Sequence, residues 1–101
     1  MMQTEVLIVR VLRNVYDPEI PVNIYDLGLI YEVNVLDDGK VVILMTLTSP
    51  GCPMADELIE EIHERIKEIE EVKEVEVKLT FNPPWNREMM SEEAKLELGF
   101  L

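Results

Sequence analysis

The sequence feature that most constrains the fold is a pair of alternating segments separated by a glycine turn. Apolar and polar residues alternate from Leu29 to Val35 and again from Val41 to Thr48, and Asp37-Asp38-Gly39 lies between them. A period of two predicts strands that bury one face, and Asp-Gly between two such runs is a strong hairpin signal. The stretch therefore predicts an antiparallel β-hairpin.

Two registers are open to this hairpin. A two-residue Asp38-Gly39 turn would set the apolar row of the second strand beside Glu32 and Asn34. A three-residue loop with Gly39 in the left-handed region sets apolar residues opposite one another. We predict the second register, which pairs Leu29, Tyr31, Val33 and Val35 with Leu47, Met45, Ile43 and Val41, and which puts Thr46 and Thr48 on the other face of the sheet.

Two segments after the hairpin predict a helix and a third strand. From Met54 to Glu71, apolar residues recur at helical spacing, with His63 near the edge of their stripe. From Val75 to Phe81, apolar and polar residues alternate, which predicts a half-buried strand. The buried stripe of the helix is expected to comprise Ala55, Leu58, Ile59, Ile62, Ile66 and Ile69.

The segment from Thr4 to Val15 is more ambiguous, because its β-branched residues also suit a strand. Thr4 is a suitable N-cap, and Ile8, Leu12 and Val15 fall on one helical stripe. We therefore predict a helix that ends before Asp17-Pro18, because the residue before a proline avoids the helical region. The predicted order is helix, strand, strand, helix, strand.

The end of the chain predicts an extended segment and a short helix. Pro83-Pro84 stops the third strand and holds Trp85 in a stiff, extended segment. Trp85 either packs at the edge of the core or serves as a recognition aromatic. In the helix that follows, we expect Ser91 as the N-cap, Leu96 on the apolar side and Gly99 as the stop. The tail is expected to cover the second sheet face (Ile30, Val42 and Leu44) with Met89, Met90, Phe100 and Leu101.

A connection of roughly a dozen residues, Tyr16 to Gly28, joins the first helix to the hairpin. Irregular loops of this length are uncommon in compact domains and are usually functional. It carries three carboxylates, Asp17, Glu19 and Asp26. Each of them suits a turn or a cap as well as a site, so the loop as a whole is the better candidate.

Cys52, the only cysteine, lies where the second strand ends and the long helix begins. Pro53 suits the first helical position, which makes Cys52 the expected N-cap. Unpaired N–H groups and the helix dipole favour a thiolate there. The alternative is a small buried apolar residue. The Pro50-Gly51-Cys52-Pro53 setting favours the reactive thiol.

Composition excludes several classes of protein. With 21 acidic and 9 basic residues the net charge is -12, which disfavours nucleic acid and anionic membranes as partners. One cysteine forms no internal disulfide, no apolar run reaches the ~20 residues of a membrane span, and no signal peptide is recognisable. We expect a cytoplasmic protein with one domain, residues 1–101: a core at about 4–81 and a C-terminal addition at 82–101.

The sequence contains no recognisable set of catalytic groups. It lacks a Gly-rich phosphate loop, a Ser/His/Asp set and cysteine or histidine clusters at zinc spacing. A thiol enzyme would need a base beside Cys52, but His63 lies about three turns along the helix that Cys52 begins. We therefore predict that the protein is not an enzyme; a structural module with an inert cysteine remains open.

Four motifs occur in the order and approximate spacing of one family. They are Asp17-Pro18-Glu19, Asp26-Leu27-Gly28-Leu29-Ile30-Tyr31, Thr46-x-Thr48-x-x-x-Cys52-Pro53 and Pro83-Pro84-Trp85. From about Val6 to Gly99 the sequence resembles the SufT/PaaD-like proteins of iron-sulfur cluster maturation, which are related to the eukaryotic cytosolic iron-sulfur targeting factor. The resemblance implies an α+β fold: a two-layer αββαβ domain with a three-stranded sheet and a C-terminal helix.

The resemblance also implies a function. Members look like accessory factors that deliver or insert iron-sulfur clusters into client proteins, and this is the function we expect. One branch serves an oxygenase for phenylacetyl-CoA, so an accessory subunit dedicated to such an oxygenase complex is the alternative. Cys52 matches the family's reactive cysteine and is the candidate metal ligand, and the polar residues that line the same small site match Asp17, Glu19, Asp26, Thr46 and Thr48. Pro84 and Trp85 are candidates for partner binding.

One thiolate limits what such a site holds. Related scaffold proteins use two cysteines two positions apart, whereas this chain has only Cys52. Clusters generally take four thiolate or imidazole ligands, so we expect no tightly bound cluster in the monomer. A transient cluster or iron ion would be completed by exogenous thiols, a second subunit or a client. Expected partners are client proteins and other assembly factors, with the chain itself a monomer or weak homodimer.

Overall fold

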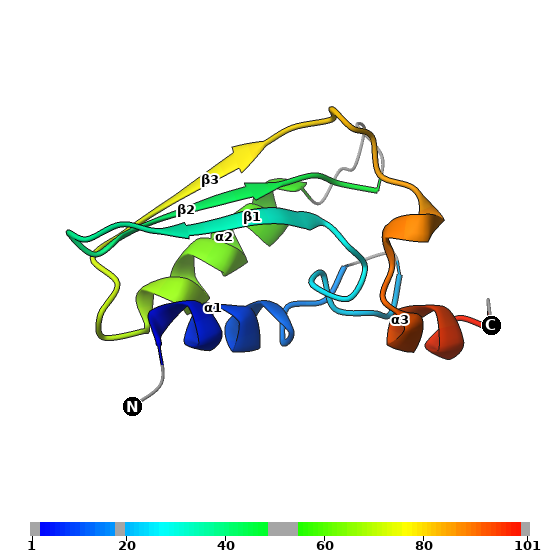
Figure 1. Cartoon of the computed structure of the whole chain (residues 1–101), viewed down its shortest axis with the longest axis horizontal. Helices are drawn as coiled ribbons and strands as arrows, with labels where there is room; N and C mark the ends of the chain where they lie inside the picture. The colour runs from blue at the N-terminus through cyan, green and yellow to red at the C-terminus, as the bar shows by residue number, and fades with distance from the viewer. Residues whose placement is uncertain (1–2, 18–19, 49–54, 100–101) are drawn as a thin grey trace.

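The computed structural model describes residues 3–17, 20–48 and 55–99. The predictions for Glu19 and Cys52 therefore lie outside the described residues. The elements follow one another in the predicted order, including the predicted C-terminal helix (Figure 1). They are α1 (Thr4–Leu12), β1 (Ile30–Val35), β2 (Lys40–Met45), α2 (Ala55–Lys67), β3 (Glu74–Leu79), the 3-10 turn η1 (Arg87–Met89) and α3 (Glu92–Glu97).

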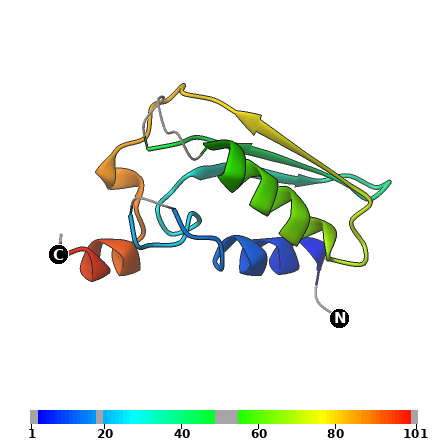
Figure 2. The ribbon, with the colours of Figure 1, turned by 180° about the vertical axis from the view of Figure 1, so that it is seen from behind.

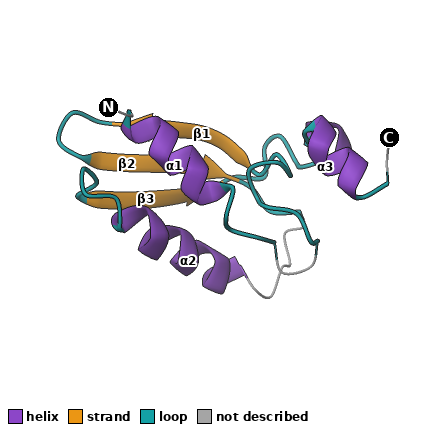
Figure 3. Cartoon of the chain, turned by 90° about the horizontal axis from the view of Figure 1, so that it is seen from below, coloured by secondary structure: helices purple, strands orange, loops and turns teal. Residues whose placement is uncertain are grey.

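The three strands form one sheet in the order β1-β2-β3. β1 and β2 pair antiparallel as a hairpin, and β2 and β3 pair parallel. A parallel pair needs a crossover connection, which α2 supplies. Figures 1 and 2 show α1 and α2 on the same side of the sheet, and Figure 3 shows α1 beside the hairpin and α2 along β3. The predicted two-layer α+β architecture is confirmed.

The hairpin register is confirmed near the turn and wrong at the far end. Val33 lies opposite Ile43 and Gly39 has a φ of 88°, as the three-residue loop requires. Between Ile30 and Glu32 the register shifts, so that Ile30 rather than Tyr31 lies opposite Met45. Such a bulge inserts one extra residue into a strand.

The strand β2 also ends earlier than predicted, at Met45 rather than Thr48. The Thr46 amide donates to the Leu29 carbonyl at 2.8 Å, and the Thr46 side chain is fully buried. Thr46 and Thr48 therefore lie beyond the last residue of β2. Their placement on the second face of the sheet stays a prediction.

The first helix is shorter than predicted. It begins at Thr4, but its N-cap is Gln3 without a side-chain cap, so the assignment of Thr4 as the cap is wrong. It ends at Leu12 instead of Val15. The Val15 amide donates to the Leu12 carbonyl, three residues back, and the Val15 carbonyl accepts from the Ile24 amide at 2.8 Å. A tight turn and a contact with the following loop thus take the place of the last helical turn. Val15 nevertheless stays fully buried.

The other boundaries shift by a few residues. α2 ends at Lys67, before Glu71, and β3 ends at Leu79, before Phe81. The Ser91 hydroxyl accepts from the Ala94 amide at 3.1 Å, which confirms the predicted N-cap of α3. Leu96 is 67% exposed, so its placement on the apolar side is wrong; Ala94 is the buried residue of that helix.

The core lies between the sheet and the two long helices. The opposite face of β2 carries side chains of intermediate burial. Of the tail residues expected to cover that face, Met90 lies in the core, Met89 borders a groove beside Ile30 and Leu44, and Phe100 and Leu101 lie outside the described residues. Fully buried apolar residues are Ile8, Leu12, Val15, Ile24, Leu27, Leu29, Val41, Ile43, Met45, Ile62 and Ile66.

Within the described ranges, no helix is both long and apolar enough to cross a bilayer.

Candidate functional site

The loop of residues 13–29 lies at one end of the sheet, together with the end of β2 and the start of α2 (Figures 1 and 3). Within it, an isolated bridge pairs Tyr16 with Asn23. The Asp17 amide adds a bond to the Val22 carbonyl at 3.3 Å. Backbone pairing therefore holds residues 16–17 beside residues 22–23 and places Asp17 in the paired part of the loop.

Asp17 is 6% exposed, which is rare for a carboxylate. Its Oδ1 accepts from the Ile20 amide at 3.0 Å. Asp17 thus stabilises the turn in which it lies, as the structural interpretation of the sequence expected. Its burial also places this carboxylate inside the protein, at the loop end of the sheet.

Asp26 is bonded reciprocally to Asn23. Asn23 Nδ2 donates to Asp26 Oδ2 at 2.8 Å, and the Asp26 amide donates to Asn23 Oδ1 at 2.8 Å. Asp26 also lines a small pocket of about 90 Å³, together with Glu93 and Glu97 of α3. Its hydrogen bonds with Asn23 stabilise the loop.

The segment of residues 82–91 fastens this loop from outside. Trp85 Nε1 donates to the Leu27 carbonyl at 2.6 Å, and the Ser91 amide donates to the Asp26 carbonyl at 2.8 Å. Gly28 has a φ of 84°, and a Cβ added there would collide with the Met89 carbonyl group. Trp85 is half-buried and packs against the core, so it has at least the structural role that the sequence left open.

Thr46 carries the most unusual polar group of this region. Its side chain is fully buried, and its hydroxyl has no hydrogen-bond partner among the described residues. Leaving a buried polar group unsatisfied costs roughly 1–3 kcal/mol, and native structures contain few such groups. Thr48, two residues further on, is half-buried. This end of β2 leads to residues 49–54, outside the described ranges.

The described residues do not by themselves form a metal centre. Among them, no group of three or more His, Cys, Asp or Glu side chains is placed to hold a metal ion. Of the predicted site residues, Asp17, Asp26, Thr46 and Thr48 are described, and all four lie in the loop or directly after β2. The structure thus brings the loop and the strand end together, while the predictions for Glu19 and Cys52 stay untested.

Sequence reasoning missed the partners that shape the loop. Asn23 could have been found, because an Asn three residues before an Asp suits a capping arrangement, in which the Asn side chain accepts from the amide three residues on. The Leu27 carbonyl as acceptor for Trp85, and the fit of Gly28 against Met89, had no local signal, because these partners lie far apart in the chain.

Comparisons with known proteins agree with this architecture. The model of a family described as iron-sulfur cluster assembly protein matches residues 5–79. A relative from Porphyromonas gingivalis, named Fe-S protein maturation auxiliary factor, is 61% identical over 100 residues, which cover 99% of this chain and 95% of the relative. A Bacillus subtilis relative, Fe-S protein maturation auxiliary factor YitW, is 46% identical over 91% of this chain and 90% of its own length.

Two solved structures share the fold. A domain of unknown function from Bacillus anthracis superposes with a TM-score of 0.90 at 40% identity, covering 97% of this chain and 93% of that chain. A conserved hypothetical protein from Thermotoga maritima gives a TM-score of 0.79 at 42% identity, covering 91% and 90% of the two chains.

Fold and loop together define a two-layer α+β domain of the kind found in iron-sulfur assembly factors. The chain belongs to the iron-sulfur cluster assembly protein family and is SufT-like. The resemblance predicted from the four motifs is thereby confirmed.

Proposed function

We propose that this protein is an accessory factor that delivers iron-sulfur clusters to client proteins, or inserts them, through the Cys52 thiolate. The observation that carries the proposal is the match of 61% identity along 99% of the chain to a maturation auxiliary factor. A relative that matches over nearly the whole chain supports transfer of the role as well as the fold.

Around Cys52 we propose a small polar site formed by Asp17, Glu19, Thr46 and Thr48. The unpartnered Thr46 hydroxyl supports this, because a buried polar group retained without a partner calls for an explanation. Asp26 acts through the loop, because its carboxylate is bonded to Asn23. In this proposal, the polar groups orient the Cys52 thiolate and the cluster or iron ion bound to it.

A single thiolate suits transfer better than storage. Clusters generally need four ligands, and the described residues offer no group of three. We propose that exogenous thiols, a second subunit or the client complete the shell, so that a cluster or iron ion is bound transiently. Incomplete ligation by this chain favours release to an acceptor with a full ligand set.

We propose that the role is non-enzymatic. A thiol nucleophile needs an adjacent base, and His63 lies eight residues into α2, about 12 Å along the helix at ~1.5 Å per residue. The proposed partners are client proteins and other assembly factors in the cytoplasm, with Pro84 and Trp85 at the contact surface. Pro84 is exposed, whereas Trp85 is half-buried.

Anaerobic reconstitution with iron and sulfide tests the proposal, with wild type and Cys52→Ser compared by visible absorption and iron per chain. We expect labile iron in the wild type and at least a tenfold lower iron content in Cys52→Ser. A Thr46→Ser control keeps the hydroxyl and should load iron. Equal iron in wild type and Cys52→Ser would contradict a role for the thiolate. No iron in either would leave an adaptor that carries no metal.

A further inference from the structure

The outer edge of β3 is a row of backbone groups that no strand among the described residues pairs with. β3 is the last strand of the sheet, and it pairs with β2 alone among the described elements. The amides of Glu74 and Thr80 donate towards β2, to the Gly39 and Met45 carbonyls. Successive residues of a strand direct their backbone groups to opposite sides, so Val75, Val77 and Leu79 direct theirs outward.

The two edges of the sheet differ in regularity. β1 carries a bulge between Ile30 and Glu32, a device that blunts an edge against further pairing. β3 pairs with β2 without a shift from Glu74 to Leu79 and contains no proline. β3 is therefore the edge better suited to accept another strand.

Exposure increases along the apolar row of β3. Val75 is 7% exposed and packs in the core, whereas Leu79 is 41% and Phe81 40% exposed. Leu79 lies opposite Met45, the last residue of β2. The uncovered part of the row thus adjoins the strand end that leads to Thr46 and the candidate site.

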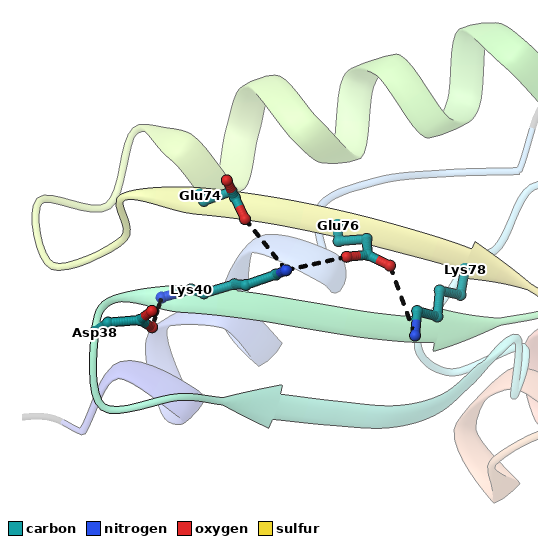
Figure 4. Close-up of polar contacts among 5 residues, drawn as sticks. All are labelled: Asp38, Lys40, Glu74, Glu76 and Lys78. Atoms are coloured by element: carbon teal, nitrogen blue, oxygen red, sulfur yellow. Dashed lines mark hydrogen bonds and ion pairs between the residues drawn. The ribbon is translucent and has the colours of Figure 1, made fainter.

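The charged side chains of β3 turn away from this edge. Lys40 of β2 forms ion pairs with Glu74 at 3.3 Å and with Glu76 at 3.2 Å, and Lys78 reaches Glu76 at 3.6 Å (Figure 4). The two carboxylates therefore point towards β2. Charges on an edge normally discourage pairing, but here they leave the outward backbone groups accessible.

We propose that the outer edge of β3 binds an extended segment of a client protein as a fourth strand. The segment would carry apolar residues against Leu79 and Phe81, alternating with basic residues, which the net charge of -12 attracts. Main-chain bonds give such strand addition its affinity, and alternate side chains give it specificity. The inference rests on the proposed delivery role, since it places a client beside the candidate site.

A second copy of this chain fits the edge less well. α2 packs against β3 (Figure 3), and a symmetric β3 pair would bring both α2 helices under neighbouring strands on one face. Paired strands lie about 4.8 Å apart, whereas packed helices need about 8–10 Å. A segment without a helix avoids this collision.

The direct test uses a synthetic peptide of alternating valine and lysine as the probe, with hydrogen exchange as the readout. Bound peptide should slow exchange of the Val75, Val77 and Leu79 amides at least tenfold and leave the amides of β1 unchanged. A peptide of the same composition with valines and lysines in blocks is the control. Equal protection by both peptides, or protection at β1, would overturn the proposal.

Matched proline variants separate the two edges. Leu79→Pro removes an outward amide of β3, and Val35→Pro removes one of β1; the two residues are 41% and 38% exposed. Leu79→Pro should weaken peptide binding at least tenfold, and Val35→Pro should not. Should Leu79→Pro not fold, Leu79→Lys replaces it. Equal binding by the β3 and β1 variants contradicts the proposal, and a dimer that protects the same amides without peptide assigns the edge to a second copy.

An apo-ferredoxin fused to the peptide tests whether binding at the β3 edge speeds transfer of a cluster to an acceptor. Wild type loaded with iron and sulfide should supply the tagged ferredoxin at least tenfold faster than the untagged one, and Leu79→Pro should lose this advantage. Cys52→Ser should bind the peptide normally and supply nothing, so failure of carriage is distinguishable from failure of docking. Peptide binding without any gain in transfer would refute the client role of the edge.

Discussion

At the scale of single residues, the Thr46 hydroxyl is the group least explained by folding. It is fully buried and has no partner in the part of the chain that the structure describes. Removing such a group while keeping its shape removes a desolvation penalty. Thr46→Val should therefore raise the free energy of unfolding by about 1 kcal/mol, measured by urea denaturation. Thr46→Ser, which keeps the hydroxyl and loses the methyl group, should not be stabilising.

The same pair of variants tests use of the hydroxyl. If it contacts the carried metal or orients Cys52, Thr46→Val should lower iron loading while raising stability, a combination that packing alone does not produce. A loss of stability in Thr46→Val would instead mean that the hydroxyl has a partner in the native protein.

Gly28 offers a second test at the residue scale. Its φ of 84° and its contact with the Met89 carbonyl leave no room for a Cβ, so Gly28→Ala should lower the free energy of unfolding by at least about 2 kcal/mol. Gly99 has a similar φ of 82° but nothing within 4 Å, and Gly99→Ala should cost about 1 kcal/mol. Equal losses in thermal denaturation would contradict the proposed packing of the loop.

At the scale of elements, the ion pairs across β2 and β3 give the sheet a pH dependence. Hydrogen bonding and attraction from Lys40 lower the pKa of Glu76, and bonds to Glu76 and Glu74 raise the pKa of Lys40. The Glu76 contribution is complete above its ordinary pKa and is lost as pH falls through the lowered pKa. The Lys40 contribution is complete below its ordinary pKa and is lost as pH rises through the raised pKa.

Glu76→Gln should therefore flatten the acid side of the stability profile, below the ordinary pKa of 4.5. Added salt should reduce the difference between wild type and variant, because these side chains are solvent-exposed. Melting temperatures from pH 3 to 7 at two salt concentrations provide the measurement. Glu64→Gln, on the exposed face of α2, is the control, and an equal change in this control would contradict the assignment.

The elements also show where sequence reasoning succeeds. The pairing of Val33 with Ile43 was predictable because a local glycine and two alternating rows determine it. The shift at Ile30 and the early end of α1 were not, because they follow from contacts with other segments, such as the bond from the Ile24 amide to the Val15 carbonyl. Local sequence patterns do not identify partners that lie in another segment of the chain.

In the candidate site, too, some features were predictable from the sequence and others were not. Its polar residues were recognisable as motifs, and Asp17 and Asp26 also satisfy the turn chemistry that the sequence allowed. The fastening of the loop by Trp85 depends on a bond across 58 residues, which requires the folded chain. Trp85 could therefore be named as important without its contact being predictable.

At the scale of the whole molecule, the C-terminal addition acts as part of the core. The family model matches residues 5–79, yet Met90 and Ala94 are buried and Trp85 is bonded to the loop. Burying one large apolar side chain contributes about 1.5–3 kcal/mol, so a chain ending at Phe81 should lose roughly 3 kcal/mol or more of stability. Circular dichroism should still report both long helices, and complete unfolding would contradict this division.

The position in the chain of residues 82–91, which hold the loop of residues 13–29 in place, also matters during protein synthesis. Translation proceeds from the N-terminus, so the loop of residues 13–29 emerges before Trp85 and Ser91; Trp85 follows its partner Leu27 by 58 residues. Contacts between distant parts of a chain also form slowly. Completion of the loop is therefore a late event in the life of each new molecule, and a chain whose translation stops early would have a sheet and two helices but an unfastened site.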